Sequence, residues 1–196
     1  MPPVTLALVV ANVAVFLLQT AVPGILIPFA LWPLGSGQEG GGGPSFELWQ
    51  VVTYAFLHGG LLHLGFNMFA LYMFGGPIEQ VFGGRRYLIY YFVCVVSAAI
   101  AQLAVSAMTG TVYPSIGASG GVFGLLLAYA IYFPRNRIML LFPPIPMPAR
   151  VFVLVYAGLE LFFGVTGTQE GVAHFAHLGG LVGGFVLLQF WRARRS

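Results

Sequence analysis

The sequence has very few charged side chains and no lysine. Charged residues make up 7% of its 196 positions, all eight basic residues are arginines, and 59% of the residues are hydrophobic. Soluble domains are typically about 25% charged, so this composition excludes an ordinary soluble domain and is typical of a protein with several membrane spans. The net charge of +3 comes without a basic stripe or a lysine cluster. We therefore predict no nucleic-acid partner.

Cysteine and sequence repeats are also scarce. Cys94 stands alone in an apolar run, which excludes a disulfide framework and predicts a buried free thiol. No internal repeat is evident, and this disfavours a secondary transporter, because many transporters are built from duplicated halves. The sequence also lacks the His-Glu-x-x-His motif of zinc proteases.

Long apolar runs dominate what is present. A helix needs about 20 apolar residues to cross a bilayer. Six runs approach this length, so we predict an all-α, polytopic membrane protein whose single domain covers 1–196, with spans at 4–22, 61–78, 87–108, 116–133, 151–165 and 172–191. The first run lacks the basic start of a signal peptide, so we expect it to be a retained helix.

The segment 23–60, between the first two runs, is rich in aromatic residues. Tryptophan and phenylalanine at this density favour the interface between membrane and water. We therefore predict a membrane-associated loop here.

The arginines predict how the chain is oriented. They follow the second, fourth and sixth runs, at Arg85, Arg86, Arg135, Arg137, Arg150, Arg192, Arg194 and Arg195. In a chain with six spans, all of these positions fall on one side of the membrane. The positive-inside rule makes that side cytoplasmic, so we expect both termini in the cytoplasm.

Four polar residues are predicted to share one depth near the outer surface. His63 and Asn67 lie near the start of the second run, Ser119 near the start of the fourth, and His177 about 9 Å into the sixth. Because these three helices run in the same direction, their polar residues meet in one layer. His63 and Asn67 are four residues apart and therefore share a helix face.

Glycine pairs spaced four apart indicate how closely two of these helices approach. They occur at Gly117 and Gly121, Gly120 and Gly124, Gly179 and Gly183, and Gly180 and Gly184. Such pairs let helix backbones pack against each other. If the fourth and sixth helices meet, His177 can accept the proton of Ser119 and activate it as a nucleophile. Donors from Asn67, His63 and the first amides of the fourth helix would then stabilise an oxyanion.

Three motifs resemble those of the rhomboid intramembrane serine proteases. They are HGGLLHLGFN at 58–67, GASG at 117–120 and AHLGGLVGG at 176–184, and the likeness extends from about residue 4 to 191. The resemblance implies a catalytic dyad of Ser119 and His177, with His63, Asn67 and Gly117 as the residues that stabilise the oxyanion and substrate. It also implies that no metal or cofactor is needed.

The resemblance further implies a substrate and a location. The partner would be a transmembrane protein in the lipid bilayer, cut near the outer leaflet of what we expect to be a prokaryotic plasma membrane. The loop 23–60 corresponds to the membrane-embedded loop of the family, and the fifth run to its lateral gate. Two positions differ from the family: Gln50 follows Trp49 where many members have arginine, and Phe123 stands where some have tyrosine. Phe123 lies one turn from Ser119, so we place it in the substrate pocket, against His177.

Other ionisable residues compete for these roles. His174 precedes His177 by three residues and is an alternative base, whereas we expect His58 to be structural. Glu160, in the fifth run, is a functional candidate because ionisable groups in membranes are costly. We favour a protonated gate residue over a third catalytic member.

Two other classes of protein remain open. A non-catalytic rhomboid-like protein would bind membrane clients without cutting them. A metal site or transporter would use His58, His63, His174 and His177. The five-residue spacing of His58 and His63 places them about 140° apart on a helix, which is a poor arrangement for one metal ion.

Overall fold

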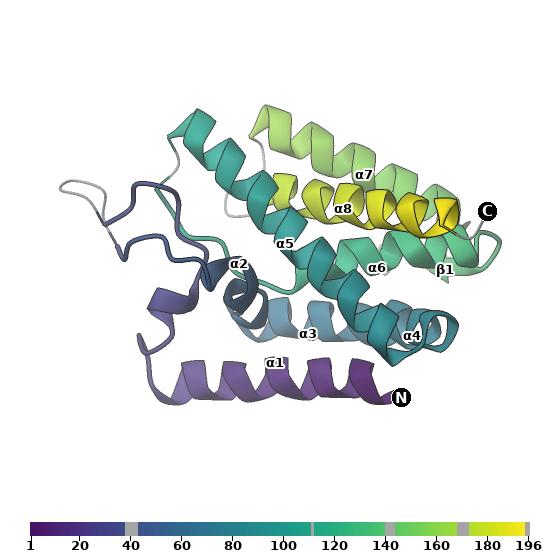
Figure 1. The fold of residues 1–196 in the computed structure, drawn as a ribbon, viewed down its shortest axis with the longest axis horizontal. Helices are drawn as coiled ribbons and strands as arrows, with labels where there is room; N and C mark the ends of the chain where they lie inside the picture. Colours follow the sequence, from purple (N-terminus) through teal and green to yellow (C-terminus); the bar gives the residue numbers. More distant parts are fainter. Residues whose placement is uncertain (38–42, 111, 140–143, 168–172, 195–196) are drawn as a thin grey trace.

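The computed structural model describes residues 1–37, 43–110, 112–139, 144–167 and 173–194. These form a bundle of helices with one short hairpin (Figure 1). The elements are α1 (Pro3–Ala21), η1 (Ile27–Phe29), α2 (Gln50–Thr53), η2 (Tyr54–Phe56), α3 (Leu61–Ala70), η3 (Leu71–Gly75), α4 (Gly76–Phe82), α5 (Gly84–Thr109), α6 (Ser119–Tyr132), β1 (Arg137–Met139), β2 (Pro146–Pro148), α7 (Ala149–Thr166) and α8 (His174–Ala193). The predicted all-α membrane class is confirmed.

Four helical segments are long and apolar enough to cross a membrane. They are α1, α5, α7 and the continuous segment Leu61–Phe82. The other two predicted spans correspond to α6, a shorter apolar helix, and to α8. The helix of the second predicted span continues past residue 78, through the π turn η3, to Phe82. That α6 and α8 also cross the membrane stays a prediction.

The helix of the fourth predicted span begins at Ser119 rather than at residue 116. Residues 115–117 are held outside the helix. Leu31 pairs with Ser115 in an isolated bridge, and the Gly117 N–H donates to the Tyr54 carbonyl at 2.9 Å. Gly117 has a φ of +127°, which side chains rarely tolerate. These contacts make Ser119 the first residue of its helix.

Glycines bring α5, α6 and α8 into backbone contact. A Cβ atom at Gly180 of α8 would overlap the carbonyl of Gly120 in α6, and one at Gly124 would overlap the Cys94 side chain in α5. The Tyr90 hydroxyl donates to the Gly124 carbonyl at 2.8 Å and joins α5 to α6. The close approach of α6 and α8 predicted from the glycine pairs is confirmed.

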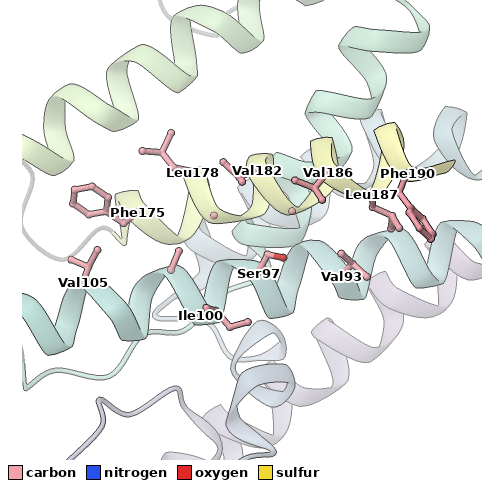
Figure 2. A pocket seen from close by; sticks show the side chains of 13 residues that line it. Val93, Ser97, Ile100, Val105, Phe175, Leu178, Val182, Val186, Leu187 and Phe190 are labelled. Carbon is pink, nitrogen blue, oxygen red and sulfur yellow. The ribbon is translucent and has the colours of Figure 1, made fainter. Parts of the chain in front are cut away.

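An apolar groove runs between α5 and α8. It has a volume of about 650 Å³ and is lined by side chains such as Val93, Ile100, Val182 and Phe190, with Ser97 at its base (Figure 2). A surface of this composition suits contact with lipid chains rather than with water.

Glu79 is a buried acid that the predicted span 61–78 left outside. Its carboxylate accepts hydrogen bonds from the Val4 N–H at 2.9 Å, the Thr5 N–H at 2.6 Å and the Thr5 hydroxyl at 2.7 Å. These amides begin α1 and have no partner within the helix. A negative charge there also complements the helix dipole. Glu79 therefore ties α4 to the start of α1.

Gln50 organises the loop between α1 and α3. Its side-chain oxygen accepts the Trp32 N–H at 3.0 Å, and its amide nitrogen donates to the carbonyls of Pro28 and Ser45, both at 3.0 Å. The side chain is fully buried. Where many relatives are expected to carry arginine, a neutral amide thus binds the backbone of this loop at three points.

The chain ends and the arginine-bearing turns gather at one end of the bundle. The N-terminus, the end of α8, the turn from α4 to α5 and the β1 hairpin all lie at the right of Figure 1. Helices α3, α6 and α8 begin away from that end. This is the arrangement expected if all these turns face the same side of a membrane.

Replacing Gly180 with valine should destabilise the protein. The new side chain would push α8 away from the Gly120 backbone, and overpacking of this kind typically costs about 1–3 kcal/mol. Gly158→Val is the matched control, because a Cβ at Gly158 of α7 meets nothing within 4 Å. Thermal unfolding in detergent measures both. Equal melting temperatures for the two variants would contradict the packing described for α6 and α8.

Replacing Glu79 with glutamine should also lower stability. The amide can accept fewer of the three hydrogen bonds at the start of α1 and loses the charge, so we expect a loss of about 1–3 kcal/mol. Glu47, an exposed acid in the loop, provides the control Glu47→Gln. Denaturant titration of the purified proteins gives the free energy of unfolding of each variant. A Glu79→Gln protein as stable as the control would show that the Glu79 carboxylate does not stabilise the start of α1.

Candidate active site

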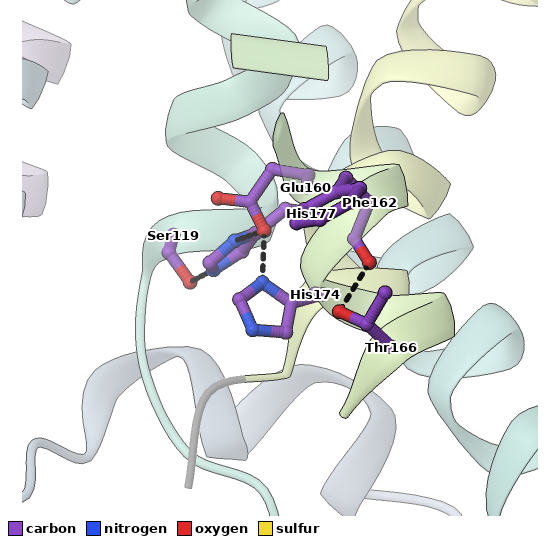
Figure 3. Close-up of polar contacts among 6 residues, drawn as sticks. All are labelled: Ser119, Glu160, Phe162, Thr166, His174 and His177. Carbon is purple, nitrogen blue, oxygen red and sulfur yellow. Dashed lines mark hydrogen bonds and ion pairs between the residues drawn. The ribbon is translucent and has the colours of Figure 1, made fainter. Parts of the chain in front are cut away.

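Ser119 and His177 come together from two helices. Ser119 begins α6, His177 lies in the first turn of α8, and the His177 Nε2 is 2.7 Å from the Ser119 Oγ (Figure 3). At this distance the hydroxyl can donate to the ring nitrogen. The alternative base, His174, instead bonds to Glu160.

Phe123 fixes the plane of the His177 ring. The two rings stack with centroids 4.3 Å apart and planes within 7° of parallel. This is the contact predicted from the spacing of Phe123 and Ser119. Tyr156 of α7 lies behind Phe123, with centroids 6.5 Å apart. This stacking opposes rotation of the imidazole about its Cβ–Cγ bond, because that rotation would tilt the ring into Phe123.

Glu160 contacts both histidines of α8. Its Oε2 forms a hydrogen bond of 2.6 Å with the His174 Nδ1 and lies 2.9 Å from the His177 Nδ1 (Figure 3). The His177 contact has the distance of an ion pair but not the alignment of a hydrogen bond. Sequence reasoning singled out Glu160 as an acid in the membrane but missed its contact with His177, because only the packing of α7 on α8 creates it.

His63 lies beside Gly117 and lines the same cavity as Ser119. Its Nδ1 accepts the Gly59 N–H at 3.3 Å, so in the neutral ring the proton is on Nε2. A Cβ at Gly117 would lie only 2.8 Å from that Nε2. The missing side chain at Gly117 therefore leaves room for an N–H donor next to the serine.

Asn67 is buried one turn after His63. Its Nδ2 donates to the His63 carbonyl at 2.9 Å, within its own helix. That bond uses one of the two N–H groups of the amide. The side chain also lines a cavity that it shares with Ser119, where its second N–H can donate to a bound group.

A cavity of about 1490 Å³ contains the predicted side chains. Its lining includes His63, Asn67, Ser119, Phe123 and His177, and Gly117 adjoins both His63 and Ser119. The remaining walls come largely from apolar residues of α3, η3, α6 and α7, such as Phe66, Met73, Leu126 and Phe152. The polar layer predicted from the sequence is thus one region of a large, mostly apolar cavity.

His58 supports the site from outside the helices. Its backbone N–H and carbonyl pair with the Gln19 side chain at 3.2 and 2.8 Å, and its buried ring meets the His63 ring edge-on at 5.0 Å. Burial, with a smaller contribution from His63, lowers the pKa of His58 to about 4. The ring is therefore neutral at physiological pH.

The four histidines do not form one metal site. His58 pairs with His63, whereas His174 and His177 lie together with ring centroids 6.5 Å apart. Among the described residues, the group that could hold a metal ion is Glu160, His174 and His177, whose donor atoms lie within 4.8 Å of one another. These donors already contact each other directly through the carboxylate.

The fold and this cavity define a helical membrane protein with a serine and a histidine in contact. The family model described as "Rhomboid domain" matches residues 45–194, and the chain belongs to the rhomboid family.

Curated relatives include rhomboid proteases of several bacteria. The chain is 34% identical to rhomboid protease GluP of Bacillus subtilis over 71% of its own length and 25% of that protein. It is 30% identical to GlpG of Pectobacterium atrosepticum over 96% of its length and 62% of that protein. It is 31% identical to GlpG of Serratia proteamaculans over 98% of its length and 63% of that protein. The chain therefore spans a quarter to somewhat under two thirds of these relatives.

A methyl group at position 117 should disturb the site. In Gly117→Ala the Cβ would overlap the His63 ring and also strain the backbone. Gly83→Ala is the matched control, because Gly83 also has a positive φ, of +74°, but a Cβ there would meet nothing within 4 Å. We expect Gly117→Ala to lose about 1–2 kcal/mol more stability than the control. Equal losses, measured by denaturant unfolding, would contradict the close contact with His63.

Proposed function

We propose that this protein is an intramembrane serine endopeptidase that cuts a transmembrane segment of another protein. The observation that carries the proposal is the 2.7 Å contact between the Ser119 Oγ and the His177 Nε2 inside a cavity with apolar walls. Family membership and relatives named rhomboid proteases support the same activity.

The proposed reaction uses Ser119 as nucleophile and His177 as base. As the Ser119 Oγ attacks the scissile carbonyl, the His177 Nε2 takes its proton. The tetrahedral intermediate collapses to an acyl-enzyme, and His177 returns the proton to the leaving amine. A water molecule then attacks the ester by the same route, releasing the acid product and restoring the serine. No metal or cofactor takes part in these steps.

Three groups are suited to stabilise the oxyanion. The His63 Nε2–H points to the region beside Gly117, the Asn67 amide lines the cavity, and the Ser119 N–H is a first-turn amide of α6. One such donor typically contributes about 3–4 kcal/mol to the transition state. The glycine at 117 matters here because it leaves this space open.

The proposed substrate enters from the membrane and is cut near the outer leaflet. The cavity has apolar walls from α3, α6 and α7, which suit an apolar peptide, and α7 corresponds to the predicted gate. The turn from α4 to α5, the β1 hairpin and the end of α8, which carry arginines, lie at the same end of the bundle as the start of α1 (Figure 1), so the positive-inside rule favours a cytoplasmic location for that end. The bacterial relatives favour a prokaryotic plasma membrane.

Removing either catalytic side chain should abolish cleavage. We expect Ser119→Ala and His177→Ala to lower kcat by at least about 10³-fold, because nucleophile and base act as a unit. The assay is cleavage of a fluorogenic transmembrane substrate by the purified protein in liposomes. Ser97→Ala is the control, since Ser97 packs between α5 and α8 outside the cavity.

Cleavage that persists in either variant would overturn the proposed mechanism. A wild-type protein that binds transmembrane peptides but neither cuts them nor reacts with a fluorophosphonate would instead be the non-catalytic, client-binding kind of rhomboid protein.

A further inference from the structure

We propose that Glu160 is a positioning residue for His177 and that His174 holds Glu160 in place. This inference rests on the proposed function and extends it. It adds a third helix to the catalytic unit: α6 supplies Ser119, α8 supplies His177, and α7 supplies Glu160.

The geometry places Glu160 on the side of the His177 ring opposite the serine. Nε2 faces the Ser119 Oγ at 2.7 Å, and Nδ1 faces the Glu160 Oε2 at 2.9 Å (Figure 3). To accept the serine proton, the neutral imidazole must carry its own proton on Nδ1. A negatively charged carboxylate oxygen this close to Nδ1 favours that tautomer, because it attracts the proton on Nδ1.

The charge of Glu160 also matches a specific need of this site. His177 becomes an imidazolium when it takes the serine proton, and it lies in the first turn of α8, where the helix dipole disfavours a cation. Partial burial in a mostly apolar cavity adds to that cost. A carboxylate in contact with Nδ1 offsets both effects.

No other acid in the described ranges can take this role. Glu47 is exposed in the loop before α2, and Glu79 caps the start of α1 through its bonds to Val4 and Thr5. The chain contains no aspartate. Among the residues that the structure describes, the charge beside His177 therefore depends on Glu160.

His174 fixes the carboxylate at the required point. Its Nδ1 bonds to the same Oε2 atom at 2.6 Å, and its ring packs against Phe163 of α7 with centroids 5.8 Å apart. A Cβ at Gly164 would lie 3.2 Å from the His174 Cβ, so α7 and α8 approach closely there. Because Glu160 belongs to α7, a displacement of α7 would withdraw the carboxylate from His177.

A purely structural role would leave a different kinetic signature. If Glu160 only joined α7 to α8, its loss would lower stability and leave the turnover of the folded enzyme unchanged. If it positions and charge-stabilises His177, its loss lowers kcat with little change in KM, because the interaction strengthens in the transition state.

The first experiment compares Glu160→Gln with the control Glu47→Gln. Glutamine keeps the size and an acceptor oxygen but removes the charge. We expect kcat for the transmembrane substrate to fall about 10- to 100-fold with KM within about twofold, and the rate of fluorophosphonate labelling of Ser119 to fall in parallel. The control should match the wild type, and thermal unfolding confirms that both variants are folded.

A pair of His174 variants keeps the test decisive if Glu160→Gln fails to fold. Asparagine can present an N–H near the position of Nδ1, whereas phenylalanine keeps the ring and removes the donor. We expect His174→Phe to lower kcat at least about threefold more than His174→Asn, because only asparagine can still bond to the carboxylate.

The outcomes separate this inference from the proposed function. If Ser119→Ala abolishes cleavage while folded Glu160→Gln retains the wild-type kcat, the role of Glu160 is wrong and the serine protease stands. Equal kcat values for the two His174 variants would show that His174 does not hold Glu160 in place. Loss of wild-type cleavage on chelation with EDTA would overturn the inference in favour of a metal held by Glu160, His174 and His177. A wild-type protein with no cleavage at all would reject the proposed function itself.

Discussion

The backbone contact between α6 and α8 is the constraint on which the site depends. Gly120 and Gly180 meet without side chains between them, and this brings the first turns of the two helices together. A serine and a histidine that are 58 residues apart in the chain then lie 2.7 Å apart. In a bilayer, where burial of apolar surface does not drive helices together, such close packing is a main source of association.

Glu79, Gln50 and Glu160 each take polar partners from other segments of the chain. Glu79 binds the free amides that begin α1, and Gln50 binds the backbone of the loop before α3 at three points. Glu160 meets two imidazoles in the same way. An unpaired polar group would be costly in this apolar bundle, so each of these residues fixes the relative position of the elements it joins.

The two departures from the family pattern have different structural consequences. Gln50 makes three hydrogen bonds to the backbone without a charge, so the loop is braced by a neutral side chain. Phe123 has no hydroxyl but stacks flat on His177 and orients the ring. Glu160, which lies outside the three sequence motifs, places a carboxylate in contact with His177.

The sequence by itself determined the membrane class, the order of the helices, and four polar side chains that line one cavity, namely His63, Asn67, Ser119 and His177. Apolar run length, glycine spacing and motif position are local properties, and they suffice for these conclusions. The start of α6 and the π turn η3 could not be predicted this way. The first depends on Tyr54 and Leu31, which are distant in sequence, and the second departs from regular helical periodicity. Only the tertiary structure placed Glu160 between His174 and His177, because that contact depends on how α7 rotates and packs against α8, which no local pattern records.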